Sequence, residues 1–207
     1  MASKREKNKL KTRKKIIKVA SEIFDEKGYE KTSINEIAKK AGLGVGTVYN
    51  YFSSKDIIFA ESIGKKFDMY REYIVDINQF SGKEVTDIIM DYIKKIDKSI
   101  RLIPKQLLKE LFRITIGNKR NEKLLMKFAE IDFKFIDKLE EVFVILKKEN
   151  RLDEDFNAKS MSEIIYSVYV FEFLMYLYQE DISFDDMSEN IKKKVYILFE
   201  NNMEKEV

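Results

Sequence analysis

A chain of 207 residues can bury a core in one or two domains, and its 44% apolar and 36% charged residues are typical of a folded globular protein. The absence of cysteine excludes disulfides and thiolate metal sites, and the absence of histidine removes the commonest metal ligand and general base. The formal charge is only +3, but residues 1–62 hold 14 basic and 8 acidic residues, whereas residues 63–207 hold 25 and 28. We therefore expect a basic N-terminal part and no catalytic residue, metal or cofactor.

No apolar segment of signal-peptide type follows the basic N-terminus. The most apolar run, Ile164–Gln179, is interrupted by Glu172 and is shorter than the ~20 residues that a membrane span needs. These features predict a cytoplasmic protein with no membrane partner.

Helical periodicity extends through nearly the whole chain. Glycine and proline are scarce, at seven and one, and the sequence lacks both sustained strand alternation and hairpin turn signals. The pattern predicts an all-α fold of about nine helices.

The first helix is expected to begin inside the basic run Lys4–Lys18, which holds nine cations and one acid, and to end near Lys27, before Gly28. Tyr29 should fold back onto its apolar stripe. A charge run is more often a solvated helix face than a binding element, so this run by itself favours neither nucleic acid nor an anionic membrane as a partner. The stripe consists of Ile16, Ile17, Ala20, Ile23 and Phe24.

A second, shorter helix is expected after Ser33. This residue is a good N-cap, and Glu36 three residues later completes a capping-box pattern. Gly42 should end the helix after about two turns. Its apolar face comprises Ile34, Ile37, Ala38 and Ala41.

The stretch AGLGVGTVYNYF, residues 41–52, has two interpretations. A dinucleotide or phosphate loop would need a preceding strand and a different glycine spacing, and a P-loop would also need Lys-Ser/Thr. Because a short helix precedes Gly42, a tight turn between two helices fits better. The second of these helices would cover about Val45–Phe52 and form a helix-turn-helix with the first.

In this geometry Val48 and Phe52 face the first two helices, and small polar or aromatic residues face outward. Glycine lets a backbone approach DNA closely, threonine suits a phosphate or a thymine methyl, asparagine can pair with adenine, and tyrosine hydroxyls reach phosphates. Each tyrosine alone could equally be a packing residue. The outward residues are Gly46, Thr47, Tyr49, Asn50 and Tyr51.

From about Arg13 to Ile58 the chain resembles the TetR family of bacterial transcriptional regulators. The segments IIKVASEIF, KGYEKTSINEIAKKAGL and GTVYNYFSSKDIIF look like the family's first helix, its Gly-aromatic corner and second helix, and its recognition helix with the start of a fourth. The resemblance implies a DNA-binding domain at residues 1–55, with its motif at about 33–52, and an effector-binding and dimerisation domain at 56–207.

Carried over by position, the resemblance implies phosphate contacts from Thr32, Ser33, Thr47, Tyr49, Tyr51 and Lys55, and base-edge contacts from Gly46, Thr47 and Asn50. The family usually has Ser-Lys where this chain has Gly44-Val45, so a hydroxyl cap and a cation are missing. The basic N-terminal run could compensate by binding phosphates or entering the minor groove.

After residue 55 the pattern changes to longer helices. One helix should open at Pro104 and continue to about Ile116. The others are expected at about Asp56–Gln79, Lys83–Leu102, Asn121–Arg151, Asn157–Glu180 and Phe184–Met203.

The last two helices carry a large apolar surface, and Asn157–Glu180 is apolar nearly all round. Such a helix needs burial on more than one side, which favours a partner surface. The resemblance implies a homodimer through a four-helix bundle of these helices. Two-fold symmetry would then place two recognition helices on a palindromic duplex DNA operator.

An effector pocket is implied by the resemblance alone, because the aromatic and methionine residues between the fifth and eighth helices are by themselves ordinary core residues. The pocket would suit a hydrophobic small molecule, with Arg113 or Glu172 as polar anchors. Its expected lining is Phe112, Arg113, Met126, Phe128, Phe133, Met161, Tyr166, Tyr169, Glu172 and Phe173.

Three functions therefore remain open. The favoured one is a dimeric, ligand-responsive regulator, most often a repressor in this family. The second is a non-specific nucleic-acid or anionic-surface binder driven by the basic N-terminus, and the third is a nucleotide-binding enzyme. The missing histidine, cysteine and preceding strand make the enzyme the weakest of the three.

Overall fold

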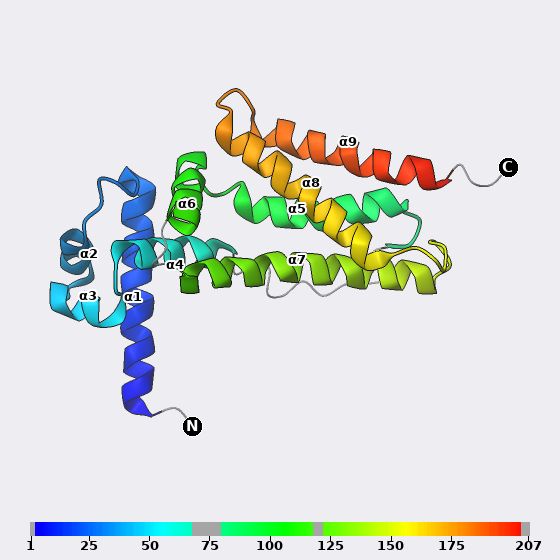
Figure 1. Cartoon of the computed structure of the whole chain (residues 1–207). Coiled ribbons are helices and arrows are strands. Elements are labelled where there is room, and N and C mark those ends of the chain that lie inside the picture. The colour runs from blue at the N-terminus through cyan, green and yellow to red at the C-terminus, as the bar shows by residue number, and fades with distance from the viewer. Residues whose placement is uncertain (1–2, 68–79, 118–121, 204–207) are drawn as a thin grey trace. The chain divides into compact units, whose positions relative to one another are not determined.

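A computed structural model describes residues 3–67, 80–117 and 122–203, and within these ranges the chain is helical without a strand (Figure 1). The predicted all-α class is confirmed. Of the helix expected at 56–79, the part at residues 68–79 lies outside the described residues. The helices are α1 (Lys4–Lys27), α2 (Ile34–Ala41), α3 (Val45–Tyr51), α4 (Lys55–Phe67), α5 (Val85–Ile100), α6 (Lys105–Gly117), α7 (Glu122–Lys148), α8 (Ala158–Tyr178) and α9 (Phe184–Met203).

The chain divides into two compact units. Helices α1–α4 and α6 form the headpiece unit, whereas α5, α7 from Met126 onward, α8 and α9 form the helical unit. These units divide the chain differently from the predicted boundary at residue 55, because α4 packs along α1 and α6 packs on α4.

The headpiece is built on one face of α1. The predicted stripe of α1 is buried in full, and α2 and α4 pack against this helix. Gly28 ends α1 at φ 79°, and Tyr29 folds back so that its ring stacks on Phe24, as predicted. Phe59 of α4 completes the cluster, with edge contacts of 4.9 Å between ring centroids to both aromatics.

The helical unit buries apolar residues from all four of its helices. In it, α8 packs along α9, and α9 also packs on α5. No helix in the described part of the chain is long and apolar enough to cross a membrane. Fully buried members of this core are Ile89, Ile93, Leu139, Val142, Phe143, Leu146, Ile165, Met187, Ile191 and Val195.

Candidate nucleic-acid interface

The turn between α2 and α3 follows from its capping residues. Ser33 is the N-cap of α2, and its Oγ accepts a hydrogen bond from the Glu36 amide at 3.2 Å. Gly42 ends α2 in the left-handed conformation (φ 63°, ψ 40°), which costs glycine no Cβ clash. Gly44 begins α3 with extended dihedrals and no side-chain cap. The predicted helix-turn-helix is confirmed.

The complete capping box lies elsewhere than predicted. At α2 the Glu36 carboxylate pairs with Lys27 instead of closing a box with Ser33. At α1 both bonds are present: Ser3 Oγ accepts from the Glu6 amide at 3.2 Å, and Glu6 Oε2 accepts from the Ser3 amide at 2.7 Å. The Ser-x-x-Glu spacing in the sequence was the missed signal.

Helix α3 has one buried and one exposed side. Val48 is fully buried and Phe52 is 2% exposed, so both face the headpiece core as predicted. Tyr49 is 53% exposed, and a Cβ added at Gly46 would meet no atom within 4 Å. The residues predicted to face outward do so: Gly46, Tyr49 and Asn50 are exposed, and Thr47 and Tyr51 are half-buried.

Thr32 and Lys55, both predicted to contact phosphates, hold the loop before α2 through bonds to backbone carbonyls. Thr32 is only 2% exposed, and its Oγ1 donates to the Gly28 carbonyl at 2.7 Å. The Lys55 ammonium donates to the carbonyls of Tyr29 and Thr32, each at 3.0 Å, and lies 4.0 Å from the Tyr29 ring centroid. These groups fix the entry into α2.

Arg13 fixes the other end of α3, a role that the sequence did not reveal. Its Nη1 donates to the Tyr51 carbonyl at 2.8 Å, and its Nη2 pairs with Glu61 at 2.5 Å. The guanidinium carbon lies 4.3 Å from the centroid of the Phe52 ring. A contact 38 residues apart in sequence has no local pattern, and a basic run gives no reason to single out this cation.

The Tyr29 phenol links the segment between α1 and α2 to α4. Its hydroxyl donates to Asp56, and burial together with this carboxylate raises the pKa of Tyr29 well above its usual value. The phenol therefore remains a neutral donor at physiological pH.

The expected effector residues are divided between the two units and differ in exposure. Arg113 belongs to the headpiece unit, is largely exposed and pairs with Glu110 at 2.5 Å and Glu30 at 3.3 Å. Met126 and Phe133 are 57% and 61% exposed. Glu172 is 3% exposed, but it pairs with Lys194 of α9 and is not a free anchor. The pattern of apolar residues in the sequence does not predict which helix faces pack against one another.

Tyr166 and Tyr169 belong instead to a closed aromatic cluster with Phe135, at centroid distances of 5.4 and 5.5 Å. The Tyr169 hydroxyl donates to Asp97 at 2.9 Å, and burial raises the pKa of the Asp97 carboxyl. Burial also raises the pKa of Asp132, which shares a hydrogen bond with Tyr166. These side chains serve as packed, hydrogen-bonded core.

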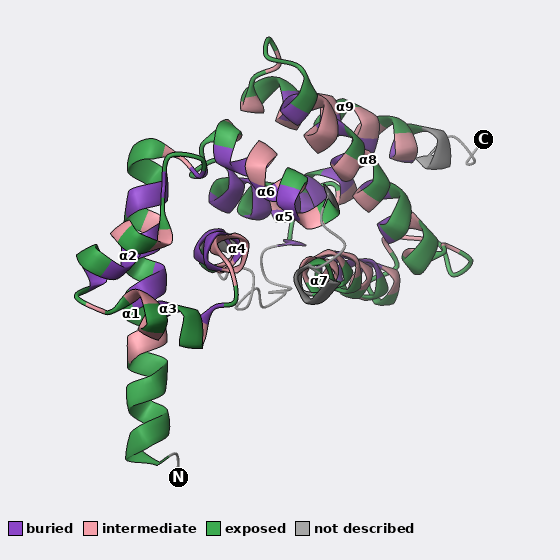
Figure 2. Ribbon diagram, turned by 60° about the vertical axis from the view of Figure 1, so that its left-hand side comes forward, coloured by how far each residue is buried: buried purple, intermediate pink, exposed green. Residues whose placement is uncertain are grey.

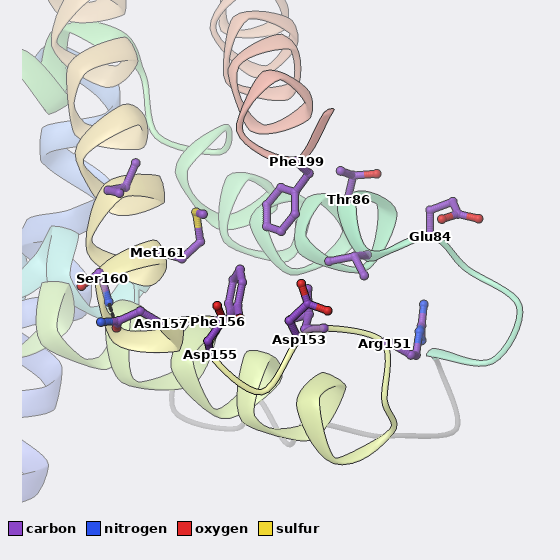
Figure 3. A pocket seen from close by; sticks show the side chains of 13 residues that line it. Glu84, Thr86, Arg151, Asp153, Asp155, Phe156, Asn157, Ser160, Met161 and Phe199 are labelled. Carbon is purple, nitrogen blue, oxygen red and sulfur yellow. Dashed lines mark hydrogen bonds between the residues drawn. The ribbon is translucent and has the colours of Figure 1, made fainter. Parts of the chain in front are cut away.

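A cavity of about 490 Å³ lies in the helical unit, where the N-terminal ends of α5 and α8 meet the loop after α7. Figure 3 shows Phe156, Phe199 and Met161 turned toward a common space, with Asp153 beside them. Of the ten expected effector residues, Met161 alone lines this cavity. The expected lining of the effector pocket stays a prediction.

A family model described as "Bacterial regulatory proteins, tetR family" matches residues 16–61, from the buried stripe of α1 into α4. Residues 16–61 are therefore similar to this family of regulators. An HTH-type transcriptional regulator of Staphylococcus aureus (strain USA300) is 34% identical over 94 residues, which cover 44% of this chain and 51% of that protein. The chain thus spans about half the length of the curated relatives it matches.

Solved structures extend the similarity to the whole fold of this chain. A transcriptional regulator from Cytophaga hutchinsonii has a TM-score of 0.68 at 21% identity, covering 90% of this chain and 95% of that one. Thermus thermophilus FadR, a TetR-family repressor in complex with lauroyl-CoA, has a TM-score of 0.65 at 21% identity, with 94% and 97% covered. At 21% sequence identity these matches show a similar fold and nothing further about function.

Proposed function

We propose that this chain is a DNA-binding transcriptional regulator of the TetR family that reads a specific duplex site with α3. The observation that carries the proposal is the two-sided character of α3, whose Val48 is buried while Tyr49 and Asn50 are exposed. The buried side fixes the helix on the headpiece, and the outward side carries the chemistry that base edges and phosphates recognise.

Individual contacts follow from this arrangement. Asn50 pairs with adenine, Gly46 brings the backbone close to the groove, and Thr47 contacts a phosphate or a thymine methyl. The hydroxyls of Tyr49 and Tyr51 contact phosphates. Ser33 adds a phosphate contact at the N-terminus of α2, where amide groups favour an anion.

The regulator acts as a homodimer through α8 and α9. One side of α8 is packed inside the chain, whereas Ile164, Phe171 and Tyr178, spaced seven residues apart, are 44%, 51% and 62% exposed. Ile197 of α9 is 56% exposed. Large apolar side chains in a row indicate a protein partner. Two-fold symmetry then gives a palindromic operator.

A hydrophobic small molecule regulates the dimer by binding in the helical unit, and the cavity lined by Phe156, Met161 and Phe199 has the volume of a ligand site. Binding releases the operator, so the protein acts as a cytoplasmic repressor. This requires the ligand to bind one state of the dimer more tightly than the other.

Selection of bound DNA from a random duplex pool tests the proposal. We expect a palindromic consensus, and we expect Asn50→Ala to relax one position of it at a cost of about 1–3 kcal/mol. Gln106→Ala, which removes an exposed side-chain amide from α6, is the matched control and should keep the consensus. A pool without a consensus would favour a non-specific binder and reject the proposal.

A further inference from the structure

The first two turns of α1 extend beyond the rest of the headpiece (Figures 1 and 2). Every residue from 4 to 11 is exposed, and the buried residues of α1 begin at Ile16. We call residues 4–11 the α1 extension. At 1.5 Å per residue the extension is about 12 Å long, comparable with three or four base-pair rises of ~3.4 Å measured along the DNA helix axis.

The extension is an ordered part of the helix and not a loose tail. The capping box of Ser3 and Glu6 starts the helix at Lys4. Arg13, two residues after the extension, bonds the Tyr51 carbonyl and Glu61, which fixes α1 relative to the end of α3. The extension is therefore held in a defined position beside the candidate recognition helix.

The charges of the extension are unfavourable in the free protein. Five of its eight residues are cations, and its one acid, Glu6, is used in the capping box. Cations near a helix N-terminus oppose the helix dipole, and the pairs Arg5–Lys9 and Lys7–Lys11 place like charges four residues apart. A bound polyanion would offset this repulsion. The cations are Lys4, Arg5, Lys7, Lys9 and Lys11.

Around α3, by contrast, several cations are already engaged within the protein. Lys40 lies 3.6 Å from Glu22 and 3.4 Å from Glu26, Lys27 pairs with Glu36, and Lys55 bonds two carbonyls. Helix α3, with the sequence VGTVYNY, contains no lysine or arginine. An attraction for phosphates must therefore come largely from other elements of the headpiece.

We propose that the α1 extension is a second DNA-binding element, which binds backbone phosphates beside the site read by α3. The proposal rests on the proposed function. A helix about 10 Å wide does not enter a minor groove about 6 Å wide, so the helical state corrects the expectation of a minor-groove arm. The sequence KREKNKLK has a single apolar residue, Leu10, and thus no apolar face for insertion into a membrane.

Two triple variants test the proposal by measuring Kd against salt concentration. The first carries Lys4→Gln, Lys7→Gln and Lys11→Gln, and the matched control carries Lys98→Gln, Lys134→Gln and Lys148→Gln, which remove three exposed lysines from α5 and α7 of the helical unit. Each is measured on a selected site and on a random duplex, and circular dichroism checks that helix content is retained.

We expect the extension variant to weaken binding to both duplexes alike and to flatten the plot of log K against log salt by about 0.9 for each phosphate that the extension no longer neutralises. The control should keep the native slope. Equal slopes for the two variants would overturn the proposal, as would a loss of affinity confined to the selected site, which would indicate base reading. If the native chain prefers no sequence, the proposed function fails, but the difference in slope still tests the extension.

An anionic membrane is the competing partner, and vesicles of phosphatidylcholine with one quarter phosphatidylserine test it. We expect the native chain and the extension variant to sediment equally with these vesicles. Vesicle binding by the native chain that the extension variant loses, together with an unchanged DNA salt slope, would assign the extension to lipid and reject a DNA role.

Discussion

The headpiece and helical units satisfy their polar groups in different ways. In the headpiece, Thr32 and Lys55 bond backbone carbonyls at the corner before α2, and Ser33 caps a backbone amide. In the helical unit, side chains on separate helices pair with each other, as Tyr169 does with Asp97. Backbone capping is fixed by local sequence, whereas pairing between helices depends on how their faces meet. The helix caps of the headpiece are therefore predictable from sequence, whereas the side-chain pairs of the helical unit are not.

The core of the headpiece should give the largest effect. Phe59 is fully buried between Phe24 and Tyr29, so Phe59→Ala leaves a cavity and should lower the free energy of unfolding by about 3–5 kcal/mol. Urea unfolding followed by circular dichroism measures this decrease. A decrease below about 1 kcal/mol would mean that the aromatic cluster is not the centre of the headpiece.

The pair between Glu172 and Lys194 should give the next effect. Lys194→Met leaves a nearly buried carboxylate without its partner and should cost about 2 kcal/mol, less than a fully buried pair because the lysine is 40% exposed. Adding Glu172→Gln should recover part of this stability. Urea unfolding at fixed protein concentration checks both values, and identical free energies of unfolding for the single and double variants would contradict this account.

The hydrogen bond between Tyr29 and Asp56 should contribute about 1 kcal/mol. Tyr29→Phe keeps the ring packing and removes only the hydroxyl, so the decrease in stability should appear in thermal unfolding without a change in helix content. Tyr49→Phe, which removes an exposed hydroxyl from α3, is the control and should leave stability within about 0.5 kcal/mol.

The uncapped start of α3 should give the smallest effect. Gly44 has dihedrals that any residue adopts, and an added Cβ would lie 3.7 Å from Thr47 Oγ1, an ordinary contact. Gly44→Ser should therefore form the missing cap and raise the free energy of unfolding by a few tenths of a kcal/mol. A decrease on denaturant unfolding would show that the cap geometry is wrong.

Local signals predicted much of the headpiece. Ser33 and Gly42 mark the ends of α2, and the four-residue spacing of Val48 and Phe52 gives the buried side of α3. The role of Arg13 was not predictable, because its partners lie 38 and 48 residues away.

The effector site was not predictable from residue type. Aromatic residues such as Tyr166 and Phe133 look alike in sequence, yet one packs in an aromatic cluster and the other is exposed. Whether each of these side chains is buried depends on how α7 and α8 are rotated about their axes relative to the neighbouring helices. The periodicity of a single helix does not give this rotation.

Competition between a selected duplex and random DNA at one stated salt concentration tests the central claim most directly. If α3 reads sequence, the native chain should prefer its site by about 10³-fold or more, and Asn50→Ala should reduce this ratio while Gln106→Ala leaves it unchanged. Equal affinity for both duplexes would contradict the account and leave a DNA binder that recognises charge alone.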